Sequence, residues 1–129
     1  MRSGAFAAAV LALAGCAAMP AGAPAVAPEF QGFWTNVDPK TANWWEITAD
    51  RVVNYGGFNG GCRHASATIL AADLIDIRFG NAGTVRMRLT GDRLVFDGAL
   101  GIAHHRRVPR TSICRRDDGT YLQDAPYKP

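Results

Sequence analysis

The chain has 129 residues, which gives room for a single domain once a leader is set aside. Its composition, 48% hydrophobic and 19% charged, is ordinary for a globular protein and argues against global disorder. The formal net charge of +3 is modest, so the whole-chain charge gives no reason to expect a nucleic-acid partner.

The start of the chain has the pattern of an export signal. Arg2 is followed by an alanine-rich apolar run over residues 5–13, which is too short to span a bilayer as a helix. The run ends in Leu13-Ala14-Gly15-Cys16, which resembles the lipobox of bacterial lipoproteins. The resemblance implies that residues 1–15 are a signal peptide and that Cys16 is acylated. The alternative is an ordinary secreted protein that is cleaved at a nearby small residue such as Ala14.

The next residues, 16–28, are rich in alanine and proline and contain almost nothing to bury. Their prolines prevent a continuous helix, and a linker of this kind extends by about 3.1 Å per residue, or up to about 37 Å over the 12 residues 17–28. We therefore expect a tether that holds a domain of residues 29–129 off a membrane. Ala17 stands where aspartate is the usual inner-membrane retention signal in enteric bacteria. Its presence favours the outer membrane, with the domain facing the periplasm.

The chain has three cysteines, and acylation of Cys16 would leave Cys62 and Cys114 as a pair in an oxidising compartment. We predict a disulfide between them, which would close a loop of about 50 residues and contribute about 4 kcal/mol on the chain-entropy model. The alternatives are two buried thiols or two metal ligands. A zinc site has little support, because the sequence has no Cys-x-x-Cys.

From residue 29 onward the hydrophobic pattern has the two-residue period of β-strands. The clearest example is residues 84–90, Thr-Val-Arg-Met-Arg-Leu-Thr, in which apolar side chains alternate with arginines. Gly91-Asp92 then gives a two-residue hairpin signal before a strand at 93–96, and Asp97-Gly98 indicates another turn. The other predicted strands are residues 30–34, 44–48, 51–55, 65–71, 74–79 and 102–108.

This spacing predicts an all-β fold. Seven or eight short strands, about ten residues apart, are typical of a small antiparallel β-barrel or sandwich. No segment after residue 29 shows a helical stripe longer than two turns. Arginines on one face of a hairpin are consistent with a sheet that has one face exposed to solvent.

Gly32-Phe33-Trp34, on the first predicted strand, resembles the Gly-x-Trp of the lipocalin-like barrels. In that family a late arginine packs on the tryptophan, and the matching position here is Arg106 or Arg107. The resemblance implies structural roles for Gly32 and Trp34 at a closed end of the barrel, with the arginine charge over the indole face. The later Thr-Asp-Tyr motif of the family is absent. Any interior cavity is expected to be small, because side chains fill a short barrel.

A glycine-rich stretch at residues 55–61 predicts a flexible loop between strands. Its side chains are candidates for a binding rim, with Phe58 as an apolar finger. The alternative is a loop that only connects two strands. The candidate rim residues are Tyr55, Phe58 and Asn59.

Basic residues gather late in the chain, with no acidic residue between 101 and 116. Strand alternation places Arg106 and Arg107 on opposite faces, so we do not expect one continuous patch. The cluster is either a solvated sheet face or a surface that contacts anionic envelope material such as lipid head groups. The members of this candidate basic surface are Arg106, Arg107, Arg110, Arg115 and Arg116.

The sequence gives little support for catalysis or for a metal site. It has no Gly-x-Ser-x-Gly, and a triad would have to combine Ser66 and His64 with a distant acid. The adjacent His104 and His105 point to opposite faces of a strand and cannot share one metal without a bulge. We therefore expect no catalytic residues, no metal, no cofactor and no nucleic-acid partner.

The predicted function is that of a membrane-anchored envelope lipoprotein with a non-enzymatic binding β-domain. Its partner would be an unknown envelope protein or a small ligand. One alternative is a hydrolase inhibitor that acts through loop 55–61, since small tethered β-domains resemble envelope inhibitors in architecture. Another is an enzyme with a pocket in the β-domain. A small-ligand site predicts an interior of at least ~300 Å³, whereas a filled barrel favours a protein partner.

Overall fold

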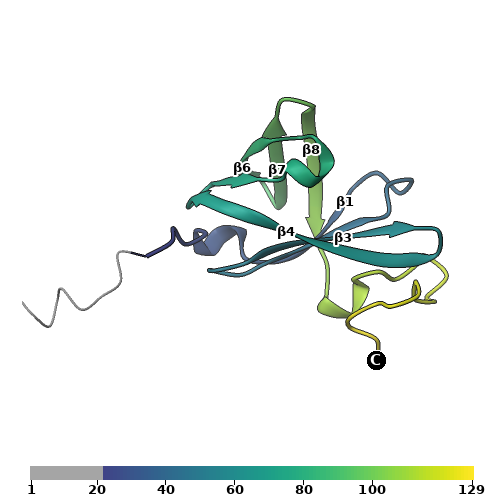
Figure 1. The fold of residues 1–129 in the computed structure, drawn as a ribbon. Coiled ribbons are helices and arrows are strands. Elements are labelled where there is room, and N and C mark those ends of the chain that lie inside the picture. Colours follow the sequence, from purple (N-terminus) through teal and green to yellow (C-terminus); the bar gives the residue numbers. More distant parts are fainter. Residues whose placement is uncertain (1–21) are drawn as a thin grey trace, which may run out of the picture.

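The computed structural model describes residues 22–129, and the predicted signal peptide and Cys16 lie outside these residues. Eight antiparallel strands form one closed barrel (Figure 1). This confirms the all-β prediction and shows that, of the two predicted architectures, the fold is the barrel and not the sandwich. Short 3-10 helices, labelled η, precede, interrupt and follow the strands. The elements are η1 (Pro28–Phe30), β1 (Gly32–Asn36), β2 (Asn43–Ile47), β3 (Val52–Phe58), β4 (Gly61–Ala71), β5 (Leu74–Asp76), η2 (Arg78–Gly80), β6 (Thr84–Thr90), β7 (Arg93–Gly98), β8 (Gly101–Arg107) and η3 (Arg110–Ser112).

Each strand pairs with the next along the chain, and β8 returns to pair with β1. The register of this closing pair places Trp34 opposite Arg107. The hairpin predicted at Gly91-Asp92 is present, because Thr90 pairs with Arg93 and Gly91 has a φ of +63°. Closure leaves the barrel without an edge strand that could pair with another chain.

The antiparallel order gives the barrel two distinct ends. At one end, which we call the closed end, η1 lies beside the β2–β3 and β4–β5 turns. The Val26 N–H donates to the carbonyl of Ala49 over 2.8 Å, and the Ala27 N–H donates to the carbonyl of Ala72 over 2.9 Å. Val26 and Phe30 are buried in the core. The packed domain therefore begins at Val26, within the stretch assigned to the tether, while residues 22–25 are exposed.

The other end, which we call the mouth, carries the β1–β2, β3–β4, β5–β6 and β7–β8 connections. Between the two ends, alternate residues of the strands point inward and form an apolar core, as the two-residue period requires. The members of this core are Val26, Phe30, Trp34, Trp45, Ile47, Val52, Ile75, Ile77, Val85, Met87, Leu94 and Phe96.

A second apolar cluster lies outside the barrel wall. Residues 109–129, which we call the C-terminal segment, pack over the outer face of β2, β3 and β4. In Figure 1 this segment runs from green to yellow beside the β3–β4 hairpin. It explains why Trp44 and Trp45 are both buried, since Trp45 faces the interior and Trp44 lies under the segment. The cluster comprises Trp44, Val53, Tyr55, Cys62, Ile113, Cys114, Leu122 and Ala125.

The C-terminal segment is fixed at several points. A disulfide joins Cys62 on β4 to Cys114, with their Cα atoms 5.9 Å apart, which confirms the predicted pairing. A parallel bridge pairs Gly61 with Gln123, next to this disulfide. The covalent link and the bridge hold the segment against the mouth-side half of β4.

The structure corrects two predicted connections. The glycine-rich residues 55–61 are not a loop, because β3 continues through Phe58 and only Asn59-Gly60 form the turn. A Cβ at Gly57 would lie 2.8 Å from Cδ1 of Leu122, so glycine is needed for the C-terminal segment to pack there. The turn predicted at Asp97-Gly98 lies two residues later, since Gly98 pairs with Gly101.

Candidate functional site

The closed end is a tightly bonded structural unit. The side chain of Trp34 is 0% exposed, and its Nε1 donates to the carbonyl of Phe30 over 2.8 Å. The residue that packs on this indole is Arg107, whose guanidinium carbon lies 4.2 Å from the ring centroid. Arg107 also donates to the carbonyls of Gln31 and Glu29, over 2.8 and 2.9 Å. These contacts fix η1 across the closed end.

Gly32 allows this arrangement. Its φ of +135° lies in the region that favours glycine, and a Cβ there would lie 2.6 Å from Nη1 of Arg107. The tip of Arg107 is held by two backbone carbonyls, so it has little freedom to move aside. The contacts of Gly32 and Trp34 therefore help to pack the closed end of the barrel.

At the mouth, the barrel interior opens into an apolar cavity of about 190 Å³. Three rings line it from different strands: Trp45 on β2, Phe96 on β7 and His105 on β8. The ring centroids of Trp45 and Phe96 are 4.8 Å apart, and those of Phe96 and His105 are 4.6 Å apart. The volume is below the ~300 Å³ expected for a site that encloses a drug-sized ligand.

Exposed apolar side chains surround this cavity. Leu100, in the β7–β8 turn, is 71% exposed, and Ile102 on β8 is 55% exposed; both line the cavity. Phe79 in η2 is 48% exposed, and its ring centroid lies 6.3 Å from that of Trp45. We call Phe79, Leu100 and Ile102 the mouth rim. Apolar side chains that gather around an apolar hollow indicate a binding surface.

The mouth cavity carries no charge at neutral pH. His105 is buried, and its Nδ1 lies 3.3 Å from the carbonyl oxygen of Leu94. Burial lowers the pKa of His105 from 6.5 to about 4, and the nearby His104 adds a smaller effect in the same direction. The Nε1 of Trp45 is also buried and has no hydrogen-bond partner among residues 22–129. The lining of the cavity is therefore uncharged and largely apolar, and it includes one residue, Trp45, whose N–H is unpaired within the described part of the chain.

The structure does not place the three candidate rim residues at the mouth cavity. Tyr55 is buried on the outer face of β3, and its ring centroid lies 6.3 Å from that of Tyr127 in the C-terminal segment. The C-terminal segment therefore covers Tyr55, and no sequence pattern near Tyr55 indicates this segment. Phe58 is 63% exposed, with the Arg63 guanidinium 5.7 Å from its ring centroid. Asn59 occupies a turn position with φ +51°, and neither it nor Phe58 lines the mouth cavity.

The structure divides the candidate basic surface into three parts. Arg106, Arg115 and Arg116 line a surface pocket of about 560 Å³, which we call the arginine pocket. Arg107 lies at the closed end, and the Arg110 guanidinium lies 5.3 Å from the ring centroid of Tyr127. Arg106 and Arg107 are therefore separated, as strand alternation predicts.

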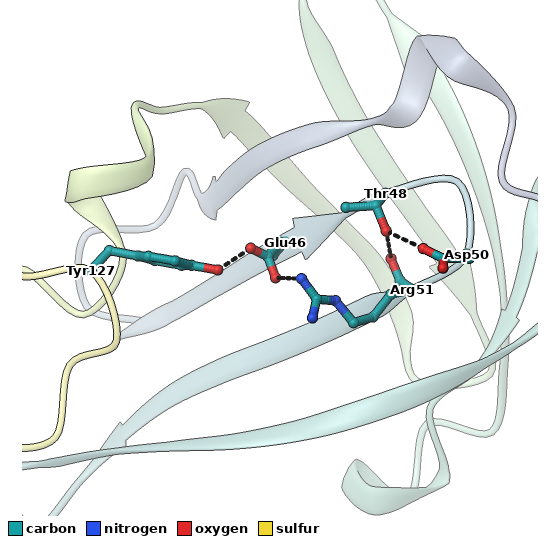
Figure 2. Close-up of polar contacts among 5 residues, drawn as sticks. All are labelled: Glu46, Thr48, Asp50, Arg51 and Tyr127. Carbon is teal, nitrogen blue, oxygen red and sulfur yellow. Dashed lines mark hydrogen bonds and ion pairs between the residues drawn. The ribbon is translucent and has the colours of Figure 1, made fainter.

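A buried carboxylate that the sequence did not reveal fixes the chain end (Figure 2). Glu46 points outward from β2 and accepts a hydrogen bond from Arg51 Nη2 over 2.7 Å and another from the Tyr127 hydroxyl. Burial, followed by the hydrogen bond to Glu46, raises the pKa of Tyr127, so the phenol remains a donor. Thr48 donates to Asp50 over 3.0 Å in the adjoining turn. Both oxygens of Glu46 have partners, which favours a structural role.

Known proteins give no further assignment. Comparison of the chain with protein-family models, with curated proteins and with solved structures finds no match. Within residues 22–129, no three His, Cys, Asp or Glu side chains are grouped so that they could hold a metal ion. The same residues contain no helix of the length and apolarity needed to cross a membrane.

Proposed function

We propose that this chain is a lipid-anchored protein of the bacterial cell envelope, and that its barrel binds a partner protein at the mouth. One observation carries the binding proposal: an apolar cavity of about 190 Å³ opens at the mouth, with the exposed Leu100 and Ile102 in its lining and the exposed Phe79 beside its Trp45. The role proposed for the barrel is binding, without catalysis.

The size and chemistry of the cavity favour a polypeptide as the occupant. Pockets that enclose small ligands measure ~300–1,000 Å³, so this cavity is too small to bury a drug-sized molecule. It instead suits a single apolar side chain, with the mouth rim excluding water around it. Protein interfaces are organised in this way, with a buried anchor in a pocket and weaker contacts around it. Because His105 is neutral at pH 7, an apolar or aromatic anchor meets no buried charge.

The anchoring part of the proposal rests on the lipobox at Leu13-Ala14-Gly15-Cys16. More than one acyl chain is needed for a stable attachment, and the lipoprotein pattern implies this at Cys16. The described chain enters the barrel at the closed end, through Val26 and Phe30. An anchor at Cys16 would therefore leave the mouth facing away from the membrane, toward partners in the periplasm. The arrangement of Gly32, Trp34 and Arg107 supports the likeness to lipocalin-like barrels, which are closed at one end.

Site-specific photocrosslinking in the source bacterium tests the mouth. A benzophenone amino acid replaces Leu100 in one strain and Leu70 in another. Leu70 is the matched control, because it is also an exposed leucine but lies on β4 near the closed end. We expect a defined protein adduct from position 100 and none from position 70. Equal adducts from both positions would contradict the proposal.

Titration with the purified captured protein then completes the test. Leu100→Asp should weaken its binding at least tenfold, whereas Leu70→Asp should leave it unchanged. If native mass spectrometry instead finds a small molecule bound in the barrel, and no protein adduct forms at position 100, a protein partner is excluded.

The anchor requires a separate measurement. The intact mass of the wild-type protein, isolated from membranes, should exceed the mass of the chain that begins at Cys16 by that of its lipid. Cys16→Ala should lack this added mass and move to the soluble fraction. If the two proteins differ only by the side-chain substitution, the chain is not acylated.

A further inference from the structure

The arginine pocket is separate from the mouth and from the closed end. It lies outside the barrel, between the β1–β2 connection, the outer face of β8 and the C-terminal segment. Arg106 comes from β8, while Arg115 and Arg116 come from the C-terminal segment. Three arginines from two parts of the chain thus line one hollow of about 560 Å³.

None of these three arginines forms an ion pair with an acidic side chain of residues 22–129. Arg115 Nε donates to the carbonyl of Gly119 over 3.2 Å, and Arg116 Nη1 donates to the carbonyl of Tyr121 over 2.9 Å. Arg116 also donates to the Thr120 hydroxyl over 3.3 Å; hydrogen bonds from Thr120 lower the pKa of Asp118, and the charge of Arg116 contributes to this lowering. Neutral acceptors therefore hold both guanidinium groups in place. A guanidinium has five N–H donors, so each retains donors for a ligand.

Two acidic residues also line the pocket, and one of them is already engaged. Asp38 accepts a hydrogen bond from the Lys40 N–H over 3.0 Å and another from the Thr41 hydroxyl over 3.4 Å. These bonds hold the carboxylate in its own loop. Asp117 is the other acid, so positive side chains outnumber negative ones by three to two at the lining.

The strand register gives an independent argument. Arg106 lies directly opposite Arg93 on the neighbouring β7, so the two side chains are on the same outer face. Like charges at directly opposed positions destabilise a sheet. An anion bound beside Arg106 would offset this repulsion, and no side chain among residues 22–129 supplies one through an ion pair.

We propose that the arginine pocket binds the phosphate group of an organic phosphate. A phosphate accepts paired hydrogen bonds from the planar fork of arginine, and it carries enough charge and oxygens to engage several guanidinium groups. The pocket is larger than a phosphate alone requires, which leaves space for the group that the phosphate esterifies. The proposal is independent of partner binding at the mouth.

Phosphate binding in the arginine pocket should depend on the disulfide between Cys62 and Cys114. Arg115 directly follows Cys114, and it pairs with Tyr121 in an isolated antiparallel bridge. Loss of the disulfide should loosen the wall that carries Arg115 and Arg116, although the Gly61–Gln123 bridge still holds the segment, while Arg106 remains on β8. Phosphate binding should therefore be weaker when the disulfide is reduced.

Calorimetric titration of the purified protein with glycerol 3-phosphate tests the site, with vesicles of phosphatidylglycerol as a second arm. We expect saturable binding in one arm, and Arg106→Gln should weaken it at least tenfold. Arg88→Gln is the matched control, because it removes the same charge from an exposed strand position away from the pocket. If the protein binds the soluble ester, the ligand is a free phosphate metabolite. If it binds only the vesicles, the ligand is a lipid head group.

Two outcomes would overturn the proposal: no saturable binding in either arm, or equal weakening by Arg106→Gln and Arg88→Gln. The double variant Cys62→Ser, Cys114→Ser provides a further check, together with its circular dichroism spectrum. If the double variant keeps the β-barrel spectrum and binds as tightly as wild type, the proposed dependence of phosphate binding on the disulfide is wrong.

Discussion

Arg107 covers the indole of Trp34, with its guanidinium carbon 4.2 Å from the ring centroid. The two residues are cross-strand partners in the β1–β8 pair that closes the barrel. Arg107 also bonds to the carbonyls of Gln31 and Glu29, so one side chain joins the last strand, the first strand and η1.

Arg107→Ala should therefore destabilise the barrel. It removes a cation–π contact and two charge-assisted hydrogen bonds, and we expect the free energy of unfolding to fall by about 2 kcal/mol. Arg106→Ala, on the opposite face of the same strand, should change it by less than about 0.5 kcal/mol. Urea unfolding followed by tryptophan fluorescence measures both. Equal losses of unfolding free energy in the two variants would show that the contacts of Arg107 do not stabilise the barrel.

Gly32→Ala should be more harmful than an ordinary glycine substitution. The new Cβ would lie 2.6 Å from Arg107 Nη1, at a φ of +135°. We expect a loss of about 1–3 kcal/mol from backbone strain and from displacement of the guanidinium. Gly80→Ala is the control, because a Cβ at Gly80 would have no other atom within 4 Å and the φ of that residue is ordinary. Thermal unfolding should separate the two variants, and similar melting temperatures would argue against a strained site.

His105 should make the stability of the protein depend on pH. Its pKa is lowered from 6.5 to about 4 in the folded state, so the unfolded chain binds a proton at pH values where the folded chain does not. The free energy of unfolding should therefore be highest above pH 6.5 and fall as the pH drops, with about 3 kcal/mol lost by pH 4. His105→Gln should flatten this slope, whereas the exposed neighbour His104→Gln should keep it. Denaturant midpoints from pH 4 to 8 provide the measurement.

Tyr127→Phe should loosen the C-terminal segment. The variant leaves one oxygen of the buried Glu46 without its hydroxyl donor, which should cost about 1–3 kcal/mol. Tyr121→Phe removes a hydroxyl bonded to the carbonyl of Thr111 at an exposed position, and we expect a smaller loss. Hydrogen exchange should show faster exchange in residues 109–129 of the Tyr127 variant. Unchanged exchange there would mean that the hydrogen bond from Tyr127 to Glu46 does not help to hold the segment.

The regular parts of the fold were predictable because strand alternation is a local signal. Residues 84–90 form β6 without any shift, since their apolar and arginine side chains face opposite sides. The glycines near Phe58 have no side chain with which to show a period, so the prediction of a loop there was wrong. The reason for Gly57 lies in Leu122, far along the chain.

The candidate sites could be predicted less well from the sequence, because they depend on contacts between distant residues. Phe79, Leu100 and Ile102 come from different connections and strands, and no spacing in the sequence links them. The burial of Tyr55 is explained only by the C-terminal segment that covers it. The pairing of Cys62 with Cys114 could be predicted because it followed from counting cysteines.

Barrel closure also sets the order of events as the chain folds. Arg107 and Gln31, which hold the seam together, are 76 residues apart in the sequence. A chain that emerges N-terminus first presents β1 with an unpaired edge until β8 arrives, and such edges invite pairing with other chains. Because contacts this distant form slowly, the early strands need protection for most of synthesis or transport. Cys114 lies beyond β8 in the sequence, so its link to Cys62 can form only after all eight strands have emerged.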